Sequence, residues 1–378
     1  MKVALVYDRV NKIGGAERVL LALHEIYPDA PLYTAVYNPK GAPWAKVFPK
    51  VIPSFLEKFP FAKSHHEIYP WLMPLAFESF NFDEYDLVIS VTSEAAKGII
   101  TKPKTYHLCY CLTPTRYLWQ SYWEYFKNPF WRVITKPLVV RLRLWDQIAS
   151  SRPDTYIAIS QNVAQRIKKY YQREAEVICP PVDLKKFAPK LYTLHPNPYS
   201  QKSSAYFLVV SRLVPYKRID IAIKAFNKLG LPLKIVGSGV EERKLKRIAR
   251  SNIEFLGQNL TDDELLQYYQ NCRAIIFPGE EDFGLVPIEA QACGKPIIAF
   301  EGGGVLESVI EGVTGEFFSP QTPEALARVV KQFKDERYKP EECRKNAEIF
   351  SKENFKKKFK EYILRCQAIQ HRGLTKRV

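Results

Sequence analysis

Short apolar runs alternate along this chain with longer segments in which apolar residues recur every three or four positions. Such runs are typical of buried strands, and such segments are typical of helices that bury one face. In the first half of the chain we expect strands at 3–7, 87–91, 106–111, 155–159 and 176–179, and helices at 17–24 and 161–171. Strands that alternate with helices predict parallel sheets whose faces are covered by helices.

The alternation stops after residue 182, where Pro189, Pro196 and Pro198 stand among polar residues. We interpret this stretch as a linker. A second series of expected strands follows it, at 206–210, 233–236, 253–256, 274–277, 296–300 and 315–318. Two series of this kind predict an α/β protein with two Rossmann-like, doubly wound domains, whose ligands bind at the carboxyl ends of the strands.

The last part of the chain carries Phe355, Phe359, Ile363 and Cys366 at helical spacing, with lysine and arginine on the other faces. We therefore expect a terminal helix that packs its apolar stripe back on the body. The expected parts are a domain at 1–185, a linker at 186–204, a second domain at 205–350 facing the first across a cleft, and a helix at 351–378 that can cross back to the first domain.

Length and composition narrow the function classes. A chain of 378 residues exceeds one ordinary core, and no apolar run reaches the roughly 18 residues that a membrane-spanning helix needs. The first residues enter a strand pattern directly, without the pattern of a signal peptide. The seven cysteines form no CxxC pair, so we expect reduced thiols. The net charge of +16 predicts an acidic partner, which can be a sugar-nucleotide phosphate, an anionic membrane or a nucleic acid.

The segment from Glu281 to Glu289 is the sharpest local signal. It follows an expected strand, contains Gly284 and leads into a helix. A turn of this kind presents backbone N–H groups at a helix N-terminus, where phosphate or hydroxyl groups can bind. Carboxylates also accept hydrogen bonds from sugar hydroxyls. The alternative is that both glutamates only satisfy the dipole of a helical first turn.

Other strand ends carry cations and glycines. Arg212 and Lys217 flank the loop after strand 206–210, where two cations can neutralise a diphosphate leaving group; solvated surface charge is the alternative. Gly14 and Gly15 follow the first strand and allow the backbone to approach a phosphate or a sugar closely. Further glycine-rich strand ends occur at 237–239 and 302–304.

Together these motifs resemble glycosyltransferase family 4, whose members have the two-domain GT-B fold. The resemblance rests on residues 211–217, 236–239, 255–257, 281–296 and 315, in the family's order. Residues 14–18, 109–119 and 301–304 further resemble bacterial mannosyltransferases that use GDP-mannose in lipopolysaccharide O-antigen and exopolysaccharide assembly. The resemblance implies a retaining hexosyltransferase whose first domain binds the acceptor and whose second domain binds the nucleotide sugar.

The resemblance also implies roles for individual residues. Glu281, Arg212 and Lys217 are the catalytic candidates, with Glu281 holding donor-sugar hydroxyls and the two cations holding the diphosphate. Glu289 would bind the ribose hydroxyls. The remaining donor-binding candidates are loop positions: Gly14 and Gly15 for the phosphate, Phe283, Gly284 and Leu285 for sugar and phosphate, and Asn259 and Leu260 for the base.

Two features of the sequence modify this picture. No Asp-x-Asp triplet occurs, so we expect no metal and no other cofactor, with cations and helix N-termini stabilising the leaving group. Leu112 stands where relatives have a histidine, and His107, in the same strand, is expected to be an ordinary strand residue rather than its substitute. Two alternatives stay open, namely the same fold with a UDP-hexose donor and a nucleotide-sugar-binding pseudoenzyme.

The segment 116–145 interleaves aromatic and basic residues, and all six tryptophans lie in the first half of the chain. This pattern favours peripheral contact with anionic lipid headgroups, and with it a lipid-linked glycan acceptor at the cytoplasmic face of the plasma membrane. The alternative is that the aromatics build the core of the first domain. A nucleic-acid partner is not expected, because no RNA-binding module accompanies the segment.

Overall fold

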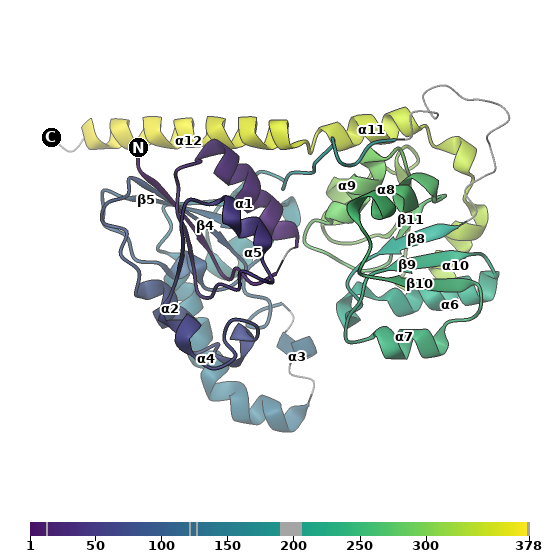
Figure 1. Ribbon diagram of the computed structural model, residues 1–378, viewed down its shortest axis with the longest axis horizontal. Coiled ribbons are helices and arrows are strands. Elements are labelled where there is room, and N and C mark those ends of the chain that lie inside the picture. The colour runs from purple at the N-terminus through teal and green to yellow at the C-terminus, as the bar shows by residue number, and fades with distance from the viewer. Residues whose placement is uncertain (13, 121, 126–127, 190–205, 376–378) are drawn as a thin grey trace. The chain divides into compact units, whose positions relative to one another are not determined.

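The computed structural model describes residues 1–375 apart from 13, 121, 126–127 and 190–205 (Figure 1). The chain forms two compact units: unit 1 contains Met1–Pro180 and Phe355–Val378, and unit 2 contains Pro181–Asn354. Each unit is built on one parallel sheet, which confirms the predicted α/β class. Within the described residues, no helix combines the length and apolar character needed to cross a bilayer.

Unit 1 has a seven-stranded sheet in the order β3-β2-β1-β4-β5-β6-β7. Its strands are β1 (Val3–Tyr7), β2 (Leu32–Thr34), β3 (Val51–Pro53), β4 (Leu87–Thr92), β5 (Tyr106–Cys111), β6 (Thr155–Ala158) and β7 (Glu176–Val177). Its described helices include α1 (Gly15–Ile26), α2 (Met73–Glu78), α3 (Tyr122–Tyr125), α4 (Pro129–Ser150) and α5 (Gln161–Tyr171). Every residue of β1 and β4 is buried, which requires cover on both faces of the sheet.

Helix α12 (Lys352–Thr375) belongs to unit 1 from Phe355 onward. The expected apolar stripe is buried, from Phe355 to Cys366. The ring of Phe355 contacts that of Tyr110 on β5, and Lys356 pairs with Glu25 of α1 at 2.8 Å. The helix therefore packs on the sheet and helices of unit 1, as the spacing predicts.

Unit 2 has a six-stranded sheet in the order β10-β9-β8-β11-β12-β13. Its strands are β8 (Phe207–Val210), β9 (Leu233–Val236), β10 (Ile253–Gly257), β11 (Ile275–Phe277), β12 (Ile297–Phe300) and β13 (Gly315–Phe318). Its helices are α6 (Ile219–Leu229), α7 (Glu242–Ile248), α8 (Asp262–Asn271), α9 (Leu285–Ala292), α10 (Pro323–Gln332) and α11 (Pro340–Glu348). All strand pairs are parallel, so every carboxyl end lies at one edge.

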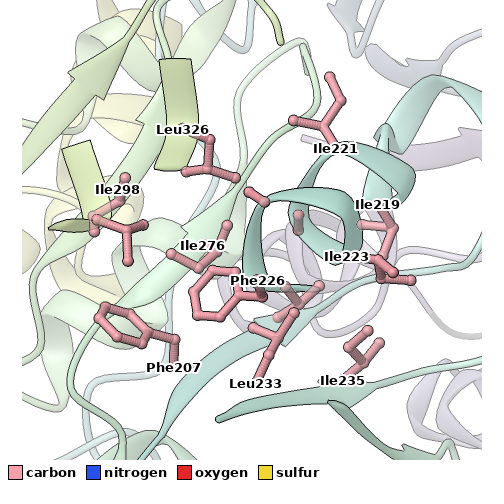
Figure 2. Packing of buried hydrophobic residues seen from close by; sticks show 14 of the residues in the cluster. Phe207, Ile219, Ile221, Ile223, Phe226, Leu233, Ile235, Ile276, Ile298 and Leu326 are labelled. Carbon is pink, nitrogen blue, oxygen red and sulfur yellow. The ribbon is translucent and has the colours of Figure 1, made fainter. Parts of the chain in front are cut away.

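The core of unit 2 lies between the sheet and helices α6 and α10. Figure 2 shows Phe207, Ile276 and Ile298, from three neighbouring strands, with Phe226 of α6 and Leu326 of α10. Alternate residues of a strand point to opposite faces, so one face of β8 faces this cluster while the other faces away. Burial on both faces fixes the register of the sheet, and with it the positions of the loops at the carboxyl edge.

The chain passes from unit 1 to unit 2 between Pro180 and Pro181, earlier than the expected domain end at 185. Arg344 of α11 donates to the carbonyl oxygens of Leu184 at 3.1 Å and of Phe187 at 2.6 Å. The ring of Phe187 also lies edge-on to that of Tyr269. These contacts tie the end of the expected first domain and the start of the expected linker to unit 2; the remaining part of the linker, 190–204, lies outside the described residues.

Candidate functional site

In unit 2 the strand order reverses beside β8, whose neighbours are β9 on one side and β11 on the other. The loops that leave β8 and β11 therefore run to opposite sides of the sheet and leave a crevice between their starting points. Residues 211–217 follow β8, and residues 278–284 follow β11. Both of the sharpest sequence motifs therefore begin at the switch point of this sheet.

Lys217 and Glu281 connect these two loops directly, because the ammonium group of Lys217 forms an ion pair with the Glu281 carboxylate. Both side chains are mostly buried, with 11% and 20% of their surfaces exposed. Lys217 ends the short 3-10 turn Pro215–Lys217, which precedes α6. An ammonium group has three donors, so Lys217 can hold Glu281 and still donate to a phosphate oxygen. The structure thus brings together two of the three predicted catalytic residues.

Arg212, the third candidate, lies in the same loop, but its contact is with Tyr216 rather than with Glu281. Its guanidinium group donates to the Tyr216 hydroxyl at 2.7 Å, in an exposed position. The surrounding backbone is held by the neighbouring loop, since Leu213 N–H donates to the carbonyl of Ser238 at 2.8 Å. The Tyr216 contact keeps Arg212 on the surface of the loop, where its assignment to the diphosphate stays a prediction.

Glycines allow the strand-end loops to pack backbone against backbone. A Cβ atom on Gly237 would lie 1.9 Å from the Ser211 carbonyl oxygen, and one on Gly279 would lie 2.8 Å from the Lys217 Cα. The Gly304 N–H donates to the Glu281 carbonyl oxygen at 2.8 Å. The loops after β8, β9, β11 and β12 therefore form one packed layer at the carboxyl edge, centred on Lys217 and Glu281.

Helix α9 begins after Gly284, whose φ of 89° suits glycine. Glu281 precedes this cap, and no acidic residue lies in the first turn of α9. The alternative that both glutamates only satisfy a helical first turn is therefore wrong. Glu289 lies deeper in the helix, 4% exposed, and its carboxylate accepts from the Tyr269 hydroxyl at 2.7 Å.

The remaining donor-binding candidates in the loops of unit 2 differ in how far they are exposed. The Phe283 side chain is buried and its ring packs on Phe350, so only its backbone can face a ligand. Leu285 opens α9 and is partly exposed. Asn259 is exposed and Leu260 partly buried, after the end of β10. The preceding residue, Gln258, accepts from Ser238 in the loop after β9, so this segment adjoins the same edge.

Gly14 and Gly15 belong to unit 1, at the turn from β1 into α1. Gly14 is the N-cap of α1 with extended backbone, and a Cβ atom there would lie 3.1 Å from the Glu17 carboxylate. Glu17 is buried and accepts from the Tyr7 hydroxyl at 2.8 Å. The two glycines thus form the start of α1 at the carboxyl edge of the sheet of unit 1, close to the Glu17 carboxylate.

Sequence reasoning missed a polar cluster at the switch point of unit 1, between β1 and β4. Buried Asp8 accepts from the Thr92 hydroxyl at 2.8 Å and from the backbone of the loop after β4. Arg9 donates to Glu94 at 2.7 Å. Burial and the Arg9 charge lower the pKa of nearby His66 to about 4. The signal in the sequence was a pair of charged residues directly after a buried strand.

Leu112 is partly buried directly after β5, and its N–H donates to the Thr92 carbonyl at 2.8 Å. His107 is fully buried within β5, and its Nε2 lies 2.8 Å from the Ser90 hydroxyl of β4. Burial and the charge of Arg152 lower the pKa of His107 to about 3. His107 is therefore a strand residue of the core, as expected, and does not reach the carboxyl edge to replace the missing histidine.

The sequence of the second half matches a known family. Residues 193–350 match the family described as glycosyl transferases group 1. An uncharacterised glycosyltransferase of Methanocaldococcus jannaschii is 28% identical over 225 residues, which is 58% of this chain and 59% of that protein. The chain spans between 34% and 59% of the length of the curated relatives it matches.

Two solved structures share the fold over nearly the whole chain. Anabaena Alr3699/HepE, in complex with UDP and glucose, has a TM-score of 0.68 at 20% identity and covers 96% of this chain and 99% of its own. Sucrose-phosphate synthase from Thermosynechococcus elongatus has a TM-score of 0.72 at 18% identity, with 98% and 100% covered. The two parallel-sheet units described above are thus those of the GT-B fold.

Proposed function

We propose that this chain is a retaining, metal-independent glycosyltransferase with a nucleotide-sugar donor, because it has the GT-B fold and its residues 193–350 match the glycosyl transferases group 1. The observation that carries this proposal is the ion pair of Lys217 and Glu281 at the switch point of unit 2. It puts a cation and a carboxylate side by side where ligands of doubly wound sheets bind.

The proposed chemistry is transfer of a hexose from a nucleoside diphosphate to an acceptor hydroxyl. The anomeric C–O bond to the diphosphate breaks, a new C–O bond forms to the acceptor, and the acceptor proton passes to the leaving phosphate. Lys217 and Arg212 stabilise the negative charge that develops on the diphosphate, together with backbone N–H groups at the start of α9. Glu281 orients Lys217 and accepts from hydroxyls of the donor sugar.

For the donor we propose GDP-mannose, because the motifs at 14–18, 109–119 and 301–304 resemble mannosyltransferases that use it. The ribose is assigned to Glu289, which the Tyr269 hydroxyl orients. A UDP-hexose is the second candidate. It is favoured by the structurally similar Alr3699/HepE, which binds UDP and UDP-glucose.

For the acceptor we propose a lipid-linked glycan, met at the cytoplasmic face of an anionic plasma membrane. A chain with a net charge of +16 is attracted to such a surface. A further structural neighbour, WaaG, is a glycosyltransferase involved in lipopolysaccharide biosynthesis. A bilayer that holds both enzyme and acceptor raises their effective concentration.

Calorimetric titration tests the donor and the metal together. The protein is titrated with GDP-mannose, GDP, UDP-glucose and UDP-N-acetylglucosamine, with and without EDTA, and the Glu289→Gln variant is titrated in parallel. We expect EDTA-insensitive binding of the guanine compounds, weakened in the variant by about 1–3 kcal/mol because the ribose loses a charged acceptor. Tyr269→Phe removes the hydroxyl that orients Glu289 but keeps the carboxylate, so it should weaken donor binding less than Glu289→Gln does.

Each other outcome has a definite meaning. Binding of uridine compounds alone would keep the enzyme class and replace the donor. Binding without turnover would favour the pseudoenzyme, and Leu112→His would then be the variant to test for restored transfer. Binding that disappears with EDTA would contradict a metal-independent site. Unchanged donor affinity in Glu289→Gln would remove that residue from the site.

A further inference from the structure

Helix α4, which Figure 1 shows within unit 1, carries apolar residues on two sides, and only one of these sides is buried. The inner face buries Val139 and Leu142, which form a small core with Leu118 and Tyr122. Ala149 is also fully buried on the inner side. Leu138 also packs against this small core and Trp145 against the main core of unit 1, whereas the large apolar residues on the other side of α4 belong to neither cluster.

The second face is exposed along the whole helix. Its large apolar side chains have between 46% and 73% of their surface exposed: Phe130, Val133, Ile134, Val140, Leu144 and Ile148. At about 3.6 residues per turn these positions fall within an arc of about 120°. Soluble proteins rarely expose this many large apolar side chains on one side of a helix unless that side binds something. We call these six residues the outer stripe of α4.

The exposed charges of α4 itself all have one sign. Lys136 is exposed beside the outer stripe and Arg141 is exposed within its arc, and Arg132 lies over the ring of Trp123 at 4.3 Å. The single acidic residue in the sequence of α4, Asp146, is 1% exposed and pairs with buried Lys97 at 2.6 Å. The surface of the helix thus combines a wide apolar stripe with exposed cations and no exposed carboxylate.

We infer that the outer stripe of α4 inserts into the surface of an anionic lipid bilayer, with the helix lying in the plane of the interface. An apolar face flanked by lysine and arginine is what such interfacial helices carry. A second copy of the chain fits this face poorly, because it would bring two basic surfaces together. This inference rests on the proposed function, in which the acceptor is attached to a lipid.

The inserted surface differs from the one that the sequence suggested. Among the aromatic residues of 116–145, Trp119 donates its indole N–H to Asp146 at 2.7 Å, and Trp145 donates to Glu78 at 2.8 Å. Both tryptophans therefore hold unit 1 together. Trp123 is 64% exposed, with the Arg132 guanidinium over its ring. Binding should then depend on apolar insertion and persist in part at high salt.

The experiment measures binding of the full chain to vesicles of phosphatidylethanolamine and phosphatidylglycerol in a ratio of about three to one. We compare the parent protein with Leu144→Asp, on the outer stripe, and with Leu364→Asp, a matched change of an exposed leucine on α12. Binding is measured by cosedimentation with the vesicles, at low salt and at about 1 M salt, where charges are screened within about 3 Å. Melting temperatures and donor titrations are recorded for all three proteins.

We expect Leu144→Asp to weaken vesicle binding at least tenfold, since a leucine loses its burial and a like charge meets the anionic lipid. Leu364→Asp should bind as the parent does, and both variants should bind donor normally. Lys136→Gln should weaken binding about fivefold at low salt.

Three results would overturn the inference: a parent protein that ignores the vesicles, equal binding by Leu144→Asp, or a dimer in sedimentation velocity that Leu144→Asp dissolves. A parent protein that binds vesicles but no nucleotide sugar would instead overturn the proposed function and leave the docking surface intact.

Discussion

The pairing of Lys217 with Glu281 changes how the two residues must be understood. The motifs suggested separate tasks, a cation for the diphosphate and a carboxylate for the sugar. In the structure each side chain fixes the other, with most of both surfaces buried. A preorganised pair of this kind costs no rearrangement when charge develops on a leaving group. We therefore expect the two residues to act as a unit in transfer.

Lys217→Ala should lower kcat/KM for transfer by about 10²–10³, because a cation next to the leaving group is lost. The free energy of unfolding should fall as well, by about 3 kcal/mol, because the mostly buried Glu281 carboxylate loses its partner. Lys244→Ala is the control, because Lys244 forms an exposed pair with Glu241 at 2.8 Å. Kinetics and urea unfolding check both values.

A double variant tests whether Lys217 and Glu281 contribute to transfer together or independently. If Lys217 and Glu281 act together, Lys217→Ala combined with Glu281→Gln should be little worse than Lys217→Ala alone. Additive losses in kcat/KM would show independent roles. Unchanged transfer with a large drop in stability would make the ion pair purely structural.

At the scale of elements, glycine spacing sets the layer of loops around this pair. Gly237 has a φ of 130°, and its missing side chain lets the Ser211 carbonyl approach. Gly237→Ala should therefore displace the loop 211–217, cost about 2 kcal/mol or more of stability and weaken donor binding about tenfold. Denaturant unfolding and calorimetry measure the two effects.

Gly230→Ala provides the matched comparison. Gly230 also has a positive φ, of 68°, but a Cβ atom added there would meet no other atom within 4 Å. The substitution should cost about 1 kcal/mol through backbone strain alone and leave donor affinity unchanged. Equal donor affinity in the two variants would show that the loop 211–217 does not bind the donor.

The sequence pattern predicted most of the strands and helices, but not the shortest strands or the face of α4 that is buried. Long buried strands such as β1 and β4 were found because apolar runs are distinctive, whereas β2 and β3, with three residues each, are too short to show a period. The two faces of α4 were hidden for another reason. Apolar residues all round a helix do not tell which face is buried, and only the exposed fractions separate Val139 from Val140.

At the scale of the whole molecule, the two units repeat one arrangement. In each, an ion pair joins the loops that leave the two strands at the switch point, Arg9 with Glu94 in unit 1 and Lys217 with Glu281 in unit 2. Sequence order could not reveal either pair, because 85 residues separate the first and the strand order decides which loops meet. The motifs identified the strand ends, and the sheet topology brought them together.

The units should respond differently to acid, because unit 1 holds two buried histidines, His66 and His107, with lowered pKa values. The pKa of a histidine in the unfolded chain is about 6.5, whereas the pKa of His107 in the folded chain is about 3. Between these values the unfolded state binds more protons, so stability is full above pH about 6.5 and falls as the pH decreases. His107 alone should contribute about 1.4 kcal/mol per pH unit across that window.

All six tryptophans lie in unit 1, so their fluorescence follows the unfolding of this unit. Urea unfolding at pH 7 and at pH 5.5, read by fluorescence, should therefore show a loss of stability that His107→Gln reduces, because glutamine does not titrate. The slope against pH is the readout, so the result stands even if the variant is less stable at neutral pH. His65→Gln, a change of an exposed histidine in the same unit, is the control variant. An unchanged slope in His107→Gln would mean that other groups, with His66 next in line, control the acid sensitivity of unit 1.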